Sequence, residues 1–148
     1  MSHSTLIYRN LECSTSSEIL SFLADKLKDE GFAKDGYKEA ILKREVEYPT
    51  GLPAAIKIAI PHCDHTLVNE SAIAMGILNN PVDFQAMDDR SITLDVQIVI
   101  MLALNEPHGH IEMLQKIISL IQNSEDLKKI IEAKSDEAIL EVVKSYLD

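Results

Sequence analysis

The chain is organised around the stretch REVEYPTGLPAAIKIAIPHCDH, which runs from Arg44 to His65. Within it, the segment IKIAI at residues 56–60 alternates apolar and polar side chains, which predicts a short, half-buried strand. Pro61 cannot donate a hydrogen bond to a neighbouring strand, so the strand is expected to end there and to place His62 on the following turn. A histidine at the end of a strand is held by a rigid scaffold and is still open to a partner molecule.

The side chains of this stretch suit a phosphoryl group. The imidazole of His62 is partly neutral near pH 7 and is therefore a nucleophile. The tripeptide Pro49-Thr50-Gly51 predicts a turn with a hydroxyl and with a glycine whose backbone can approach a ligand closely. The planar guanidinium of Arg44 carries N–H donors that fit phosphate oxygens. Arg44 also has a simpler interpretation, because a cation in the last turn of a helix stabilises that helix without binding a ligand.

These motifs resemble the enzyme IIA domains of the fructose–mannitol type, which belong to the bacterial phosphoenolpyruvate-dependent sugar phosphotransferase system. The resemblance is carried by RE at residues 44–45, PTG at residues 49–51 and IAIPH at residues 58–62. The wording EYPTG at residues 47–51 and PHC at residues 61–63 is most similar to the galactitol-specific branch. Length and element order also fit a stand-alone IIA, so the resemblance covers nearly the whole chain.

The resemblance implies a phosphocarrier. In this family the histidine of the AIPH motif accepts a phosphoryl group from the phosphocarrier HPr. It then passes the group to a cysteine of an enzyme IIB, which works with the membrane component IIC in the uptake of a sugar or alditol. By resemblance, His62 is phosphorylated, Arg44 and His110 assist catalysis, and Thr50 and Gly51 bind the phosphoryl group. No cofactor or metal ion is implied, because the group moves between protein side chains.

His110 can be interpreted in two ways from the residues alone. It lies at the head of a predicted helix, whose positive end disfavours the imidazolium and keeps the ring neutral. A neutral ring can donate to a phosphoryl oxygen or hold His62 in one tautomer. The other interpretation is packing against Leu114. The resemblance favours the functional role.

Other neighbours of His62 have open roles. The carboxylate of Asp64 or Glu45 could orient His62 through its second ring nitrogen, or could be a solvated charge. Cys63 could be a nucleophile, but it is more typical of a small buried residue with an unreactive thiol.

Two other functions compete with the phosphocarrier. One is a regulatory, nitrogen-type module that controls other proteins through its phosphorylation state. The other is a small metal-dependent hydrolase built on the histidines. The histidines at 62–65 and 108–110 lack the spacing of metal ligands, so no metal site is predicted. His65 and His108 are expected to be exposed in loops.

The composition is that of a globular protein. The 148 residues are 46% hydrophobic, which predicts a single domain at residues 1–148. The net charge of −10 argues against binding to nucleic acid or to an anionic membrane and favours a protein partner with a basic rim. No apolar run approaches the roughly 20 residues of a membrane helix, and residues 1–5 lack the layout of a signal peptide. The two cysteines have no CxxC spacing, so a cytoplasmic protein is expected.

Strands that alternate with helices predict an α/β fold, with a mixed β-sheet sandwiched by helices. Strands are expected at residues 5–8, 56–60, 71–78, 82–84 and 94–104, the last of them central. Asn79-Asn80-Pro81 is expected to form a turn. Helices are expected at 16–30 after a serine cap, 35–45 after Asp35, from 105–107 to 121, at 125–133 and at 136–147. The third of these should carry Pro107 in its first turn and bury a stripe of Ile111, Leu114, Ile118 and Ile121.

Overall fold

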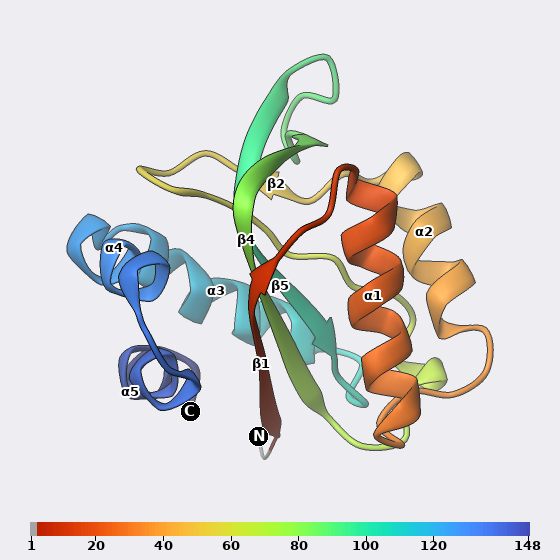
Figure 1. The fold of residues 1–148 in the computed structure, drawn as a ribbon. Helices are drawn as coiled ribbons and strands as arrows, with labels where there is room; N and C mark the ends of the chain where they lie inside the picture. Colours follow the sequence, from red (N-terminus) through yellow and green to blue (C-terminus); the bar gives the residue numbers. More distant parts are fainter. Residues whose placement is uncertain (1–2) are drawn as a thin grey trace.

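The computed structural model describes residues 3–148 as a mixed five-stranded sheet with helices on both faces (Figure 1). The strands are β1 (Ser4–Leu11), β2 (Gly51–Leu52), β3 (Lys57–Ala59), β4 (Ala72–Gln85) and β5 (Thr93–Ala103). The helices are α1 (Ser16–Asp29), α2 (Tyr37–Glu47), α3 (Gly109–Ile121), α4 (Ser124–Glu132), α5 (Asp136–Leu147) and the short 3-10 helix η1 (His65–Leu67). The predicted α/β fold is confirmed. The expectation about a signal peptide depends partly on Met1 and Ser2, which lie outside the described residues.

The sheet places the strand that precedes His62 beside its central strand. The strand order is β1-β4-β5-β3-β2, so β5 is central, as its apolar sequence predicts. β3 runs parallel to β5, whereas β4 is antiparallel to β5 and β2 is antiparallel to β3. Because the carboxyl ends of parallel strands lie at one edge of a sheet, the segments that follow β3 and β5 come close together there.

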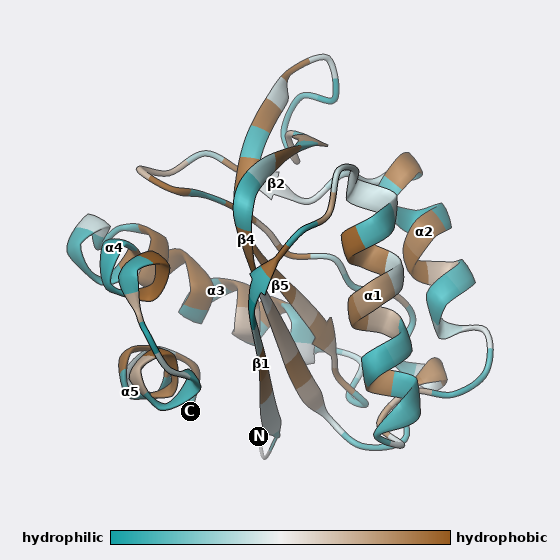
Figure 2. Ribbon diagram, viewed as in Figure 1, coloured by the Kyte–Doolittle hydropathy of each residue, from teal (hydrophilic) through white to brown (hydrophobic). Residues whose placement is uncertain are grey.

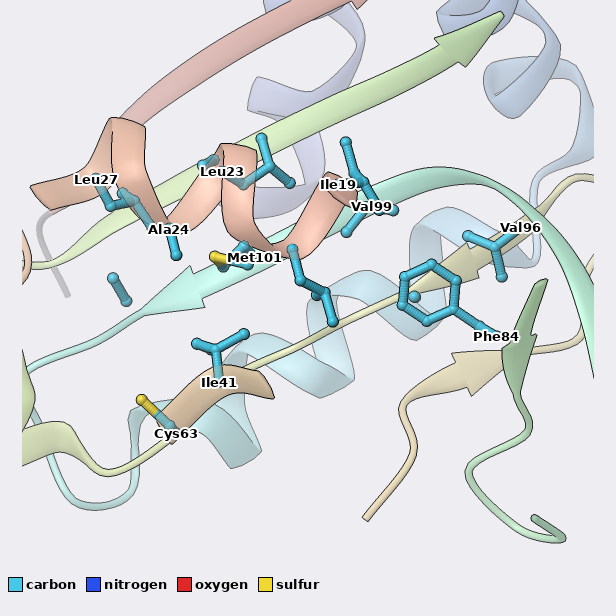
Figure 3. Packing of buried hydrophobic residues seen from close by; sticks show 14 of the residues in the cluster. Ile19, Leu23, Ala24, Leu27, Ile41, Cys63, Phe84, Val96, Val99 and Met101 are labelled. Atoms are coloured by element: carbon cyan, nitrogen blue, oxygen red, sulfur yellow. The ribbon is translucent and has the colours of Figure 1, made fainter. Parts of the chain in front are cut away.

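Helices cover the two faces of the sheet and form two cores. α1 and α2 lie on one side, and α3, α4 and α5 lie on the other (Figure 1). Figure 2 shows the strands largely in apolar colours and the helices in a mixture of apolar and polar ones. Side chains of β5 contribute to both cores: Val99 and Met101 pack with α1 (Figure 3), whereas Ile98 and Ile100 pack with α3.

α1 buries the stripe that its sequence predicts. Ile19, Leu23 and Leu27 are fully buried against the sheet. The helix ends before Gly31, whose φ of 86° lies in the left-handed region that favours glycine.

The expected caps of the first two helices are wrong. Thr15, not a serine, caps α1, and its hydroxyl accepts a hydrogen bond from the backbone N–H of Glu18. Gly36 precedes α2 in place of Asp35. The carboxylate of Asp35 pairs instead with the ammonium group of Lys28 at 3.0 Å, so it does not cap α2.

The expected turn at residues 79–81 is also wrong. These residues lie within β4, which is a single strand paired antiparallel with β5. The register shifts between Ile77 and Val82, so the extra residues form a bulge in the strand. A bulge leaves backbone N–H groups unpaired, which is why Pro81 is tolerated there.

α3 begins later than predicted, and this changes the face that it buries. It starts at Gly109 after a turn in which the Gly109 N–H donates to the Glu106 carbonyl, so Pro107 lies outside the helix. The predicted stripe is wrong for Ile111 and Ile118, which are 63% and 38% exposed. The residues that α3 buries are Gly109, Met113, Ile117 and Leu120.

The last two helices follow the predicted ranges closely. Asn123 caps α4, where Ser124 was the expected cap, and Ser135 caps α5 as predicted. Within residues 3–148, no helix has the length and apolar character needed to cross a membrane.

Candidate active site

His62 and His110 meet at the edge of the sheet where β3 and β5 end. Pro61 follows the end of β3, and His62 lies just beyond it, bridged to Leu102 near the end of β5. α3 starts soon after β5, which brings His110 to the same edge. The centroids of the two imidazole rings are 4.7 Å apart, and the ring planes are inclined by 35°.

A hollow of about 420 Å³ contains both rings. Its walls come from the end of α2, the segment after β3 and the start of α3. The hollow therefore brings together Arg44, His62 and His110, which lie far apart in the sequence. Its lining residues are Arg44, His62, Cys63, Asp64, His65, Pro107, His110 and Ile111.

The backbone holds the ring of His62 in one tautomer. Its Nδ1 lies 2.9 Å from the carbonyl oxygen of Ile60. A carbonyl only accepts, so we assign the proton to Nδ1, which donates, and the lone pair to Nε2. Burial lowers the pKa of His62; the bond to Ile60 opposes this shift, and the charge of Arg44 adds to it. The ring is thus mainly neutral at pH 7, with a nucleophilic nitrogen at Nε2.

No carboxylate among the described residues bonds to His62, so the interpretation in which Asp64 or Glu45 orients it is wrong. Asp64 accepts hydrogen bonds from the backbone N–H and the hydroxyl of Thr66, both at 2.9 Å, and these bonds lower its pKa. Glu45 accepts from Thr50. The Ile60 carbonyl takes the part that a carboxylate plays in a catalytic triad.

His110 is expected to be neutral, and the causes of its lowered pKa are burial and neighbouring charges, whereas the effect of the helix end stays a prediction. Its pKa falls to about 4, mainly because the ring is buried, and also because His62, Arg44 and His65 add positive charge nearby. Its Nε2 is buried and has no hydrogen-bond partner among the described residues. That nitrogen is therefore unpaired although it is enclosed by the protein.

Arg44 supplies the permanent positive charge of the site. It lies in the last turn of α2 and is exposed, with its guanidinium 5.1 Å from the centre of the Tyr48 ring. Stacking on an aromatic ring limits the orientations of a guanidinium without using its N–H donors. The charge lowers the pKa of both His62 and His110, so Arg44 acts on the site electrostatically.

Thr50 and Gly51 lie outside the lining of the hollow. Thr50 is 2% exposed, and its hydroxyl donates to Glu45. At Gly51 a Cβ atom would lie 2.7 Å from the carbonyl oxygen of Gln85, so the glycine permits close contact between two strands. In this structure the close approach predicted at Gly51 is to backbone and not to a ligand.

Cys63 is a buried and unreactive thiol, as predicted. It is 5% exposed, and burial raises its pKa to about 11. Among residues 3–148, no group of three or more His, Cys, Asp or Glu side chains is arranged to hold a metal ion.

Comparison with known proteins places the chain in a family. The model described as "Phosphoenolpyruvate-dependent sugar phosphotransferase system, EIIA 2" matches residues 1–146. The chain belongs to this family. As an EIIA chain it is a phosphoryl-transfer component of that system, which confirms the predicted family and class of activity.

This EIIA chain is similar to proteins with different sugars in their names. It is 30% identical over 116 residues to the galactitol-specific EIIA component of Escherichia coli K12, a match that covers 78% of this chain and 77% of that protein. It is 30% identical over 141 residues to the fructose-specific EIIABC component of Bacillus subtilis 168, covering 93% of this chain and only 21% of that longer protein. The fold matches enzyme IIAMTL in the E. coli complex with phosphorylated enzyme IIBMTL, with a TM-score of 0.77, 21% identity and 94% of each chain covered.

The sequence did not predict two lining residues of this EIIA site. His65 was expected in an exposed loop, yet it lines the hollow, with its Nδ1 3.4 Å from a carboxylate oxygen of Asp64. Ile111 was expected in the core, yet it lies exposed at the rim. The signal for Ile111 is Gly109, because a helix that starts there buries positions 113 and 117 and turns 111 outward.

Proposed function

We propose that Nε2 of His62 carries the phosphoryl group between HPr and an enzyme IIB. The observation that supports this most strongly is the bond from Nδ1 to the Ile60 carbonyl, which leaves the Nε2 lone pair free in a hollow with Arg44 and His110. Nε2 attacks the phosphorus of phosphohistidine on HPr, the N–P bond to HPr breaks, and a new N–P bond forms on His62. The His62 ring gains positive charge as this bond forms, and the Ile60 carbonyl stabilises that charge.

The second transfer reverses the role of His62. A cysteine thiolate of IIB attacks the phosphorus, the N–P bond breaks, and the electron pair returns to Nε2. In both directions Arg44 binds the non-bridging oxygens as charge spreads over them, and the ring of His110, which lines the hollow, donates to one of them. Thr50 and Gly51, which the resemblance implies as phosphoryl-binding residues, stay a prediction, and their positions favour an indirect role.

We also propose a galactitol-like alditol system as the destination of the phosphoryl group. Two observations support this: the sequence contains the segments EYPTG and PHC, and it is 30% identical to a galactitol-specific EIIA component. The IIB partner would pass the group to sugar bound at a membrane IIC, while residues 1–148 act as a single cytoplasmic EIIA domain without a cofactor.

Reconstitution tests the proposed function. The chain is incubated with labelled phosphoenolpyruvate, enzyme I and HPr, and the modified residue is mapped by mass spectrometry at alkaline pH. A galactitol-type IIB is then added. Label on His62 that moves to a IIB cysteine supports the proposal. Label that stays on His62 with every IIB would favour a regulatory module, and absence of label would overturn the phosphocarrier role.

His110→Ala should leave His62 able to accept the label but slow its transfer to IIB. Loss of one hydrogen bond to a charged group corresponds to a decrease of about 10- to 100-fold. Rapid-quench kinetics in each direction measure this effect. The matched control is His108→Ala, because His108 is exposed just before the same helix and does not line the hollow. Equal rates in His110→Ala and His108→Ala would show that His110 only packs.

HPr and IIB should compete for one surface, because the phosphohistidine of HPr and the cysteine of IIB must each reach the same nitrogen of His62. The exposed Ile111 and Tyr48 provide apolar area near the hollow, as a small transient interface requires. The net charge of −10 should speed the approach of basic partners, so association should slow as salt shortens screening to about 8 Å. NMR titration with both partners is the measurement. A ternary complex would contradict a shared surface, and salt-independent association would contradict steering.

A further inference from the structure

Glu45, which is partly buried, and Thr50, which is buried, form a hydrogen-bonded pair next to the residues of the candidate site. The backbone N–H of Thr50 donates to one carboxylate oxygen of Glu45 at 2.7 Å, and its hydroxyl donates to the other at 2.8 Å. Both donors of Thr50 are therefore used by one carboxylate. The pair joins the last turns of α2 to the residue that precedes β2.

Backbone hydrogen bonds continue from this pair to His62. The Thr50 carbonyl accepts from the N–H of Ile60 at 3.3 Å. The Ile60 carbonyl accepts from Nδ1 of His62 at 2.9 Å. The two bonds are made by the two peptide groups on either side of the Ile60 Cα, so the position of the Ile60 carbonyl, which selects the tautomer of His62, is tied to where Glu45 holds Thr50.

Among residues 3–148, no cation forms an ion pair with the carboxylate of Glu45. Burial raises the pKa of its carboxyl to about 7, against the opposing effect of the two bonds from Thr50. The side chain borders a second hollow, of about 320 Å³, in which the only other ionisable lining group is Asp83 of β4. The polar groups that face this hollow from α1, β4 and β5 are Ser16, Ser17, Asp83, Gln85 and Thr93.

We propose that Glu45 is a positioning residue for phosphoryl transfer, acting through Thr50 and Ile60 to hold His62 with Nε2 unprotonated and facing the hollow. The proposal rests on the proposed role of His62. An ionised carboxylate accepts from both Thr50 donors at once, whereas a protonated one must use one oxygen as a donor. Glu45 therefore holds Thr50 best above pH 7, and the site loosens as Glu45 takes up a proton.

Glu45→Gln tests this, because glutamine keeps the shape of the protonated side chain. The matched control is Glu47→Gln, since Glu47 is exposed at the end of the same helix and its carboxylate makes no ion pair with the described residues. Imidazole ¹⁵N NMR of the unphosphorylated protein reads the tautomer of His62 directly. Wild type and Glu47→Gln should show Nδ1–H as the main tautomer, and Glu45→Gln should show a larger share of Nε2–H.

The pH profile of phosphorylation by phospho-HPr is the second readout. In wild type the rate should rise between about pH 6 and pH 8, with a component centred at about 7 from Glu45. This component should be absent in Glu45→Gln, whose rate at pH 8 should be about 10-fold lower, as is typical when a supporting partner is lost. Thr50→Val should behave like Glu45→Gln, and Thr50→Ser, which keeps the hydroxyl, should restore the component.

Each outcome decides between distinct claims. A wild-type tautomer and an unchanged pH profile in Glu45→Gln would overturn the role of Glu45, while label on His62 would leave the proposed function intact. Absence of label on the wild-type protein would overturn the proposed function. The NMR measurement of the His62 tautomer needs neither HPr nor IIB, so it would still test the role of Glu45. If Glu45→Gln fails to fold, the pH titration of Glu45 in the wild-type protein is followed by ¹³C NMR instead. His62 chemical shifts that change with the same pH midpoint as Glu45 support the proposal. His62 chemical shifts that do not change with the titration of Glu45 refute it.

Discussion

His62→Ala should abolish labelling by phospho-HPr. The variant removes the only imidazole of the hollow whose Nδ1 is bonded to a backbone carbonyl, and therefore the nitrogen with an oriented lone pair. His110 cannot replace it, because its pKa of about 4 reflects a buried and poorly basic ring. The label on wild type should be acid-labile and alkali-stable, as a phosphoramidate is.

The measurement is incorporation of label after enzyme I and HPr have been charged from phosphoenolpyruvate. His108→Ala is the control, since it removes an exposed histidine outside the hollow and should be labelled like wild type. Undiminished label on His62→Ala, or a label mapped to His65, would assign the nucleophile elsewhere in the hollow.

Arg44→Ala should fold normally and slow transfer by about 10²–10³, the usual cost of removing one donor to charge that develops in a transition state. The guanidinium is the only permanent cation that lines the hollow. Its loss should also raise the pKa of His62, because Arg44 disfavours the imidazolium. The pH below which the transfer rate falls should therefore be higher in Arg44→Ala than in the wild-type protein.

Single-turnover rates of Arg44→Ala, Arg44→Lys and Lys43→Ala decide the matter. Lys43 is the exposed neighbour on the same helix and is not in the hollow, so its loss should not change the rate. Arg44→Lys should recover part of the rate, since a point charge lacks the fork of donors. A wild-type rate in Arg44→Ala would make Arg44 a helix-end cation only.

Local patterns predicted the elements that carry His62. The apolar run of β5 marks a strand covered on both faces, and Pro61 marks the end of β3, because each effect depends on the residue itself. β4 was not predicted as one strand, because the residues on both sides of 79–81 pair with β5 and keep the chain extended through a bulge. The buried face of α3 was missed because a start at Gly109 changes which positions face the sheet.

In the candidate active site, too, some features could be predicted from the sequence and others could not. The motifs point to His62, Arg44 and His110, which line one hollow because the end of α2, the segment after β3 and the start of α3 come together there. The partners of these residues could not be predicted. The sequence left open whether a carboxylate orients His62, and the structure shows that Nδ1 of His62 donates to the Ile60 carbonyl instead. Backbone partners of this kind depend on the path of the chain and leave no mark in residue type.

The buried carboxyl of Glu45 also affects the free energy of unfolding. Between its ordinary pKa of 4.5 and its folded value of about 7, the folded chain binds more protons at Glu45 than the unfolded chain does. Stability from this group must therefore fall as pH rises through that interval, by about 3 kcal/mol if the full shift is realised. The charged carboxylate that best holds Thr50 is thus the form that folding favours least. The proposed role of Glu45 therefore implies that, near neutral pH, the chain gives up stability to keep the proposed nucleophile aligned.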